Sequence, residues 1–143
     1  MNIVGIIPAR MASSRFPGKP MVDILGMPMI GHCLKRSEMS DLLNDVYVAT
    51  CDTEIYDYVQ SIGGKAVMTA DTHERASDRT AEALLKVEKT TGKKVDIVVM
   101  IQGDEPMISP DMIQSAVEPL LKDCNIKISN LYAGIHSVEA FED

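Results

Sequence analysis

The sequence contains no tryptophan, and aromatic residues of all kinds make up only 4% of its 143 residues. Long hydrophobic runs are missing too, because none approaches the roughly 18 consecutive apolar residues that a membrane-spanning helix needs. The amino terminus has neither the basic segment nor the apolar stretch of a signal peptide. We therefore predict a cytoplasmic protein that does not use a membrane as a partner.

Cysteine is scarce as well. Cys33, Cys51 and Cys124 are widely spaced, and no C-x-x-C pair occurs. An odd number of cysteines without such pairs fits neither a zinc site nor a disulfide framework. We expect all three side chains to be small members of the hydrophobic core rather than nucleophiles.

Positive charge is also in short supply, since 14 Lys and Arg residues stand against 21 Asp and Glu residues, for a net charge of −7. An acidic protein is poorly suited to non-specific binding of nucleic acid, which needs a basic surface. The shortage is uneven: residues 1–36 contain five Lys and Arg residues but only Asp23 as an acid, a local charge of +4, which leaves −11 for the remainder. A basic pocket in an acidic body favours a small anionic ligand.

Strand-like and helix-like segments alternate along the chain without a linker or a repeat, and the length suits a single domain. Residues 95–101 are almost continuously apolar, which is typical of a central parallel strand buried on both faces. The alternation predicts an α/β fold with a doubly wound, mostly parallel sheet. Strands are expected at 3–7, 46–49, 66–68, 95–101 and 126–132, and helices from 29, from 53 with Asp52 or Thr53 as the cap, at 77–89 and at 110–121.

The loop after the first predicted strand carries Arg10, Arg15 and Lys19 and no acid. Pro8 ends that strand because it cannot donate a ladder hydrogen bond. In open α/β sheets, ligands bind beyond the carboxyl ends of the strands. Three cations at this place favour a polyanion such as the phosphates of a nucleotide, and a solvated basic face is the alternative.

The string from Pro8 to Pro20 is not a P-loop, because Pro20 replaces the required Ser or Thr and Ser13 replaces the first glycine. It instead resembles the amino-terminal signature P-A-R-x-x-S-x-R-x-P-G-K-P of the 3-deoxy-manno-octulosonate cytidylyltransferase (CMP-Kdo synthetase) family. The resemblance implies a Rossmann-like nucleotidyltransferase fold. It also implies that this loop binds the nucleotide and that two of its cations are catalytic because they neutralise phosphate charge. The implied nucleotide-binding residues are Ala9, Arg10, Ser13, Arg15 and Lys19, with Arg10 and Lys19 as the catalytic pair.

A second motif, Gln102-Gly103-Asp104-Glu105-Pro106, follows the fourth predicted strand directly and matches the family's Q-G-D-E-P motif. Nucleotidyl transfer needs a divalent ion near the phosphates. Mg²⁺ is usually held by one or two carboxylates together with phosphates and water. The resemblance implies that Asp104 is the catalytic metal ligand for Mg²⁺ and that Gln102 contacts the nucleotide. Glu105 is the weaker metal candidate, and hydrogen bonding within the loop is its alternative role.

A third motif, residues 73–79, resembles the family string H-x-S-G-T-[DE]-R, which lies over the nucleotide and reads its base. The resemblance therefore implies that His73, Ser77 and Arg79 bind the nucleotide. Arg75 and Ala76 replace the family's Ser-Gly pair. Because alanine has a narrower range of φ than glycine, the resemblance does not predict the conformation of this loop. A loop-stabilising role for His73 is the alternative to ligand contact.

The family transfers CMP from CTP to a Kdo-like ulosonic acid and releases pyrophosphate, for surface polysaccharide synthesis. Its members continue for roughly another hundred residues, still within the size of one domain. We therefore expect residues 1–143 to be the nucleotide-binding portion of a truncated cytidylyltransferase domain, impaired as an enzyme on its own and homodimeric in a longer parent. Two alternatives remain: a sugar nucleotidyltransferase with another acid or sugar-phosphate acceptor, and a catalytically silent nucleotide-binding fragment.

Overall fold

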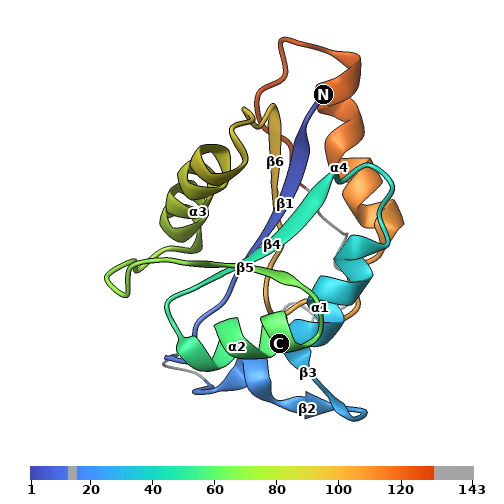
Figure 1. Ribbon diagram of the computed structural model, residues 1–143. Helices are drawn as coiled ribbons and strands as arrows, with labels where there is room; N and C mark the ends of the chain where they lie inside the picture. The colour runs from blue at the N-terminus through green and yellow to red at the C-terminus, as the bar shows by residue number, and fades with distance from the viewer. Residues whose placement is uncertain (13–15, 131–143) are drawn as a thin grey trace.

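Four parallel strands form the central sheet of the structure, a computed structural model that describes residues 1–12 and 16–130. The strands are β1 (Ile3–Pro8), β4 (Asp45–Thr50), β5 (Lys65–Met68) and β6 (Ile97–Met100), in the order β5-β4-β1-β6 (Figure 1). The chain leaves β1 for β4 on one side and later returns to β6 on the other side. The strand order therefore reverses between β1 and β6, which is where open α/β sheets bind ligands.

Helices cover both faces of this sheet (Figure 1). The helices α1 (Met29–Glu38), α2 (Thr53–Ser61) and α4 (Pro110–Lys122) pack on one face, and α3 (Ala76–Thr91) packs on the other. This arrangement confirms the predicted α/β fold with a parallel sheet. None of these helices, nor any other in the described part of the chain, is long and apolar enough to cross a membrane.

The strand β1 is the centre of the core, and all six of its residues are buried. Ile3 and Ile7 belong to the cluster beneath α1, α2 and α4, whereas Val4 and Ile6 belong to the smaller cluster beneath α3. Successive side chains of a strand point to opposite faces, so an apolar run of this kind fills both layers. The basic loop, which follows Pro8, therefore starts at the end of a strand that is buried along its whole length.

The prediction that residues 95–101 form a central strand buried on both faces was wrong for the described residues. The strand β6 pairs with β1 alone in that part of the chain and lies at its edge. Val98 and Met100 pair with Val4 and Ile6 on the face that α3 covers, but they are 40% and 43% exposed and do not belong to the cluster on that face. Residues 126–130 contain no strand, and the last two residues of the predicted strand 126–132 lie outside the described residues.

A short antiparallel hairpin, which the sequence patterns did not predict, links the basic loop to α1. It consists of β2 (Asp23–Ile24) and β3 (Met27–Pro28), and the 3-10 helix η1 (Lys19–Met21) precedes it. Both residues at its tip, Leu25 and Gly26, have positive φ, which suits a two-residue turn between twisted strands. Across the hairpin, the backbone N–H of Met29 donates to Val22 O at 2.8 Å, so the start of α1 lies beside the residue that follows η1.

The three cysteines occupy three different environments. Cys33 is buried in α1, Cys51 is half-buried after β4, and Cys124 is exposed after α4. The prediction that all three belong to the hydrophobic core is confirmed for Cys33 and was wrong for Cys124, and Cys51 belongs to neither cluster. Residues 123–128, which follow α4, are all exposed, so no packed interior surrounds the thiol of Cys124.

Candidate active site

A cavity of about 350 Å³ lies at the carboxyl ends of β1 and β6, where the strand order reverses. Three segments that are far apart in the sequence form its wall: the loop after β1 with η1, the start of α3, and the loop after β6. The lining residues are Pro8, Ala9, Arg10, Lys19, Pro20, Glu74, Arg75, Ala76, Arg79, Gln102, Gly103 and Asp104.

Parts of all three sequence motifs meet in this cavity. The predicted site residues that line it are Ala9, Arg10, Lys19, Arg79, Gln102 and Asp104. His73 and Ser77 are not among the lining residues, and Ser13 and Arg15 lie outside the described residues. Glu74, Arg75 and Ala76 line the cavity although the motif comparison did not assign them to it.

The basic loop is held at its base by backbone and side-chain hydrogen bonds. The backbone N–H of Ala9 donates to Ala49 O at 2.9 Å, and that of Gly18 donates to Met11 O at 2.8 Å. Gly18 has φ +77°, a conformation that side chains with a Cβ rarely adopt. These contacts place Lys19 at the start of η1, facing the loop after β6.

Asp52 is an anchor of the same loop that the sequence did not reveal. It occupies the N-cap position of α2, as predicted, but its side chain makes no cap hydrogen bond. Its Oδ2 instead accepts the backbone N–H of Met11 at 2.8 Å. The carboxylate therefore ties the loop that carries Arg10 to the carboxyl end of β4.

The loop that carries Asp104 is packed directly on the end of β1. A Cβ atom on Gly103 would lie 2.8 Å from Pro8 O, so this position has no room for a side chain. The thiol of Cys33, on α1, also donates a hydrogen bond to Gly103 O at 3.3 Å. Burial raises the pKa of Cys33 to about 11, which keeps the group protonated and able to donate.

Lys19 and Asp104 form an ion pair across the cavity, with Lys19 Nζ 3.5 Å from Asp104 Oδ2. Their side chains are 40% and 54% exposed, so the pair is well solvated. Exposed ion pairs of this kind typically contribute about 0–1 kcal/mol to stability. A bound phosphate or cation can therefore replace either partner at little cost to the fold.

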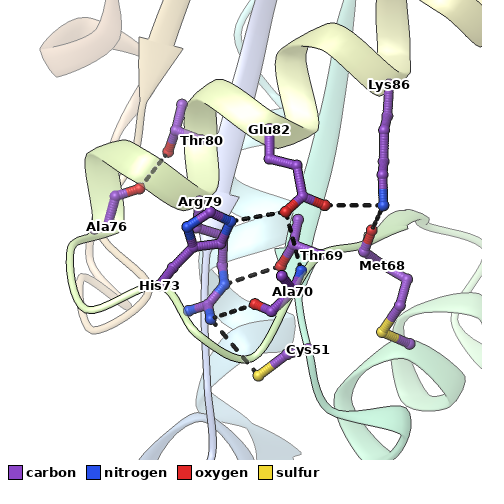
Figure 2. A network of polar contacts seen from close by, with 10 residues as sticks. All are labelled: Cys51, Met68, Thr69, Ala70, His73, Ala76, Arg79, Thr80, Glu82 and Lys86. Carbon is purple, nitrogen blue, oxygen red and sulfur yellow. Dashed lines mark hydrogen bonds and ion pairs between the residues drawn. The ribbon is translucent and has the colours of Figure 1, made fainter.

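Arg79 brings a buried positive charge to the cavity wall, since only 3% of the residue is exposed. Its Nε donates to Thr69 Oγ1 at 2.9 Å, and its Nη2 donates to Ala70 O at 3.2 Å and to Cys51 Sγ at 3.6 Å (Figure 2). Burial raises the pKa of the Cys51 thiol, so all three acceptors are uncharged. Buried cations are usually paired with an anion. Within the described residues Arg79 forms no ion pair, which makes its charge available to an anionic ligand.

The first turn of α3 adds backbone donors at the same place. Arg75 is its N-cap residue and Ala76 its first helical residue, and both line the cavity. The first four N–H groups of a helix have no partner within the helix, and the helix dipole favours negative charge there. Together with Arg10, Lys19 and Arg79, this helix start gives the cavity the chemistry of a phosphate site.

The side chain of His73 points to Glu82 of α3 (Figure 2). Its Nε2 lies 2.7 Å from Glu82 Oε1, which also accepts the backbone N–H of Ala70 at 3.0 Å. Lys86 pairs with Glu82 Oε2 at 2.9 Å. The hydrogen bond from Lys86, followed by those from Ala70 and His73, lowers the pKa of Glu82 from 4.5 to about 2.

This lowered pKa predicts an acid-sensitive contribution to stability. A carboxyl group with a depressed pKa in the folded state stabilises that state above its unfolded pKa, and the contribution disappears as the pH falls through the folded pKa. We expect Glu82→Gln to lower the melting temperature at pH 7 and the difference from wild type to shrink between pH 4.5 and about 2. Thermal melts of both proteins across this range test the prediction, and a difference that stays constant would contradict it.

Asp104 offers oxygen ligands of the kind that Mg²⁺ prefers, but it does not form a complete metal site. No group of three or more His, Cys, Asp or Glu residues within residues 1–12 and 16–130 is arranged to hold a metal ion. A half-exposed carboxylate next to a phosphate-binding cavity nevertheless fits Mg²⁺. That ion commonly takes one or two carboxylates and completes its shell with substrate phosphates and water.

The sequence matches the family model described as "Cytidylyltransferase" over residues 4–143. The chain belongs to the cytidylyltransferase family. The cavity lies within the matched region, and so do all three motifs that contribute to its wall.

Curated relatives carry the name 3-deoxy-manno-octulosonate cytidylyltransferase. The protein from Geobacter metallireducens is 42% identical over 141 residues, which cover 99% of this chain and 53% of the relative. The protein from Syntrophobacter fumaroxidans is 45% identical over 143 residues, which cover 100% of this chain and 56% of the relative. The chain therefore spans about half the length of the curated relatives that it matches.

A solved structure gives the same picture of the fold. The structure of a CMP:2-keto-3-deoxy-manno-octonic acid synthetase complexed with CTP is similar to this chain with a TM-score of 0.80 at 42% identity. The match covers 87% of this chain and 49% of that chain. Both chains therefore share the parallel sheet and its helices, which confirms the predicted nucleotidyltransferase type of the fold.

Proposed function

We propose that the cavity binds CTP and that this chain is the nucleotide-binding portion of a CMP-Kdo-type cytidylyltransferase. The observation that carries the proposal is the convergence of three motifs on one cation-rich cavity at the point where the strand order reverses. The similarity to a synthetase whose structure was solved with CTP supports the choice of nucleotide. The names of the curated relatives support a Kdo-like ulosonic acid as the acceptor.

The cavity's cations act by electrostatics in this proposal. Arg10 and Lys19 offset the negative charge of the phosphates, and the N–H groups at the start of α3 add further donors. Gln102 offers both a donor and an acceptor to the nucleotide. Transfer forms a bond from the acid's anomeric oxygen to the α-phosphorus and breaks the bond to pyrophosphate, so no protein nucleophile is needed.

Asp104 is the residue that would hold Mg²⁺, since its carboxylate is half-exposed at the same cavity. The ion supplies charge neutralisation for the phosphates when it is bound. Lys19 lies beside this carboxylate and orients it while the nucleotide is absent. The homodimer of a longer parent remains a prediction from the family resemblance, and the cytoplasmic location remains a prediction from the composition.

The proposal predicts a large effect of the two cations on nucleotide binding. We expect Lys19→Ala and Arg10→Ala each to weaken CTP binding by at least tenfold, because a charge-assisted contact to phosphate contributes roughly 1.5–3 kcal/mol. Isothermal titration of CTP into each variant, with Mg²⁺ present, measures the change. Nucleotide binding is a property that can be tested on this chain itself.

Lys122→Ala is the matched control for this experiment. Lys122 is a lysine at the end of α4, its side chain is 77% exposed, and it pairs with Glu118. Its loss removes the same charge from the protein without touching the cavity. If both cavity variants bind CTP as tightly as Lys122→Ala does, the basic loop is a solvated surface and the proposal is wrong.

A further inference from the structure

The segment between β5 and α3 has no regular secondary structure, yet its last residues form part of the cavity wall. Residues 69–75 connect the two elements, and Glu74, Arg75 and the following Ala76 line the cavity. The N–H of Thr69 still donates to Thr50 O at 2.9 Å, and Arg75 O accepts the N–H of Arg79 as α3 begins. The residues between these two points depend on side-chain hydrogen bonds for a fixed path. The groups that hold residues 69–75 therefore decide where this wall stands.

One carboxylate, that of Glu82, holds this segment at two points (Figure 2). Its Oε1 accepts the backbone N–H of Ala70 at 3.0 Å and lies 2.7 Å from Nε2 of His73. Glu82 lies on α3, and side chains of a helix lean toward its amino terminus. The side chain thus reaches back over the segment that precedes its own helix.

The carboxylate is itself held in place from the other side. Lys86, one turn further along α3, pairs with Glu82 Oε2 at 2.9 Å and donates to Met68 O of β5 at 2.7 Å. The side chain of Glu82 is only 24% exposed, so it has little freedom to swing into solvent. Lys86 and Glu82 therefore connect the end of β5, the segment and the helix in one network.

We propose that Glu82 is a positioning residue, which fixes the segment 69–75 against α3 and so sets one wall of the nucleotide cavity. It does not line the cavity, so it acts on the ligand only through the residues that it holds. The inference rests on the proposed function, because it explains how the CTP cavity keeps its shape. Arg79 binds Ala70 O, so both backbone groups of Ala70 are fixed to α3 side chains.

The inference predicts that Glu82→Ala weakens CTP binding and loosens the segment. We expect the dissociation constant for CTP to rise by about tenfold, the size of effect that leaving one partially buried donor unpaired produces. Glu82→Gln keeps one oxygen for Ala70 but loses the charge that pairs with Lys86, so it should restore part of the affinity. Calorimetric titration with CTP and Mg²⁺ measures both variants.

Glu88→Ala provides a matched control on the same helix. Glu88 Oε1 accepts the backbone N–H of Val95 at 3.0 Å, a bond of the same kind at the opposite end of α3. This variant should lower the melting temperature without changing the affinity for CTP. A purely structural role of Glu82 would make the two alanine variants behave alike, and that outcome would overturn the inference.

Hydrogen exchange separates this inference from the proposed function. In Glu82→Ala, the amides of residues 70–76 should exchange faster than in wild type, while those at the Glu88 end of α3 stay unchanged. Unchanged exchange at 70–76 would overturn the positioning role whether or not CTP binds. Faster exchange in a protein whose wild-type form does not bind CTP would leave the positioning role intact and contradict the proposed nucleotide. If Glu82→Ala does not fold, hydrogen exchange and CTP affinity are compared between Glu82→Gln and wild type instead.

Discussion

Asp104→Asn is expected to remove the Mg²⁺-dependent part of CTP binding by this chain and to abolish CMP transfer by a full-length parent, while the fold stays intact. Asparagine preserves the shape and one oxygen of the side chain but removes the negative charge that a hard divalent ion requires. The half-exposed carboxylate forms only a solvated pair with Lys19, so its loss should cost little stability. This is the largest effect that we expect from a single substitution in the cavity.

The measurement is the melting temperature of both proteins with CTP, in the presence and in the absence of Mg²⁺. A ligand at 100 times its dissociation constant stabilises a protein by about 2.7 kcal/mol. Wild type should gain more from CTP with Mg²⁺ than from CTP alone, and the variant should lose that extra gain. Glu118→Gln is the control, because it removes one exposed negative charge on α4 outside the cavity lining and should keep the full Mg²⁺-dependent gain. An equal Mg²⁺-dependent gain in wild type and Asp104→Asn would remove Asp104 from the metal site.

Gly103→Ala is expected to have the next largest effect, although glycine has no side chain that could touch a ligand. The new methyl group would lie 2.8 Å from Pro8 O, and a backbone atom cannot rotate away as a flexible side chain can. Either the end of β1 or the loop with Asp104 must move. A displacement near 1 Å can lower turnover on the order of a hundredfold. We therefore expect CTP binding by this chain and turnover by a full-length parent both to fall.

Gly5→Ala is the matched control for this prediction. A Cβ atom at this position of β1 would lie 3.0 Å from Leu43 Cδ1 and 3.3 Å from Ile101 Cδ1, both the ends of side chains, and Gly5 does not line the cavity. Overpacking in a core typically costs about 1–3 kcal/mol, so both alanine variants should melt at lower temperatures. Only Gly103→Ala should also lose affinity for CTP. If both variants lose affinity equally, the effect reports general destabilisation of β1 and not the position of the loop.

The meeting of Arg10, Lys19 and Asp104 in one cavity was predictable from the sequence. Each residue follows a strand, and the carboxyl ends of parallel strands lie at the same edge of a sheet. The apolar run of β1 and the alternation with helices were sufficient to predict the parallel sheet. The position of β6 was not predictable from its composition, because a strand's neighbours depend on pairing with distant parts of the chain.

The roles of Asp52 and Glu82 show why the rest of the site needed a structure. Asp52 has the sequence pattern of a helix cap, yet its carboxylate accepts the N–H of Met11, which only the fold brings near. An aspartate carboxylate can accept a hydrogen bond from any backbone N–H nearby, but sequence spacing identifies only the donors that are close in the sequence. The position of Glu82, one turn after Arg79 on α3, was the available signal, because residues three apart share a helix face.

The strand order has a consequence for the synthesis of the protein. The strand β1 is made early and pairs with β4 on one side. Its partner on the other side, β6, is made much later, and it pairs Ile97 with Ile3. At a translation rate of about 5–20 residues per second, roughly 5–20 s separate these two residues on the ribosome. All six residues of β1 are buried in the folded chain. Until β6 has been made, however, one edge of β1 lacks its partner and can pair with any extended segment. A translational pause between β5 and β6 would prolong this exposure, whereas a pause after β6 would not.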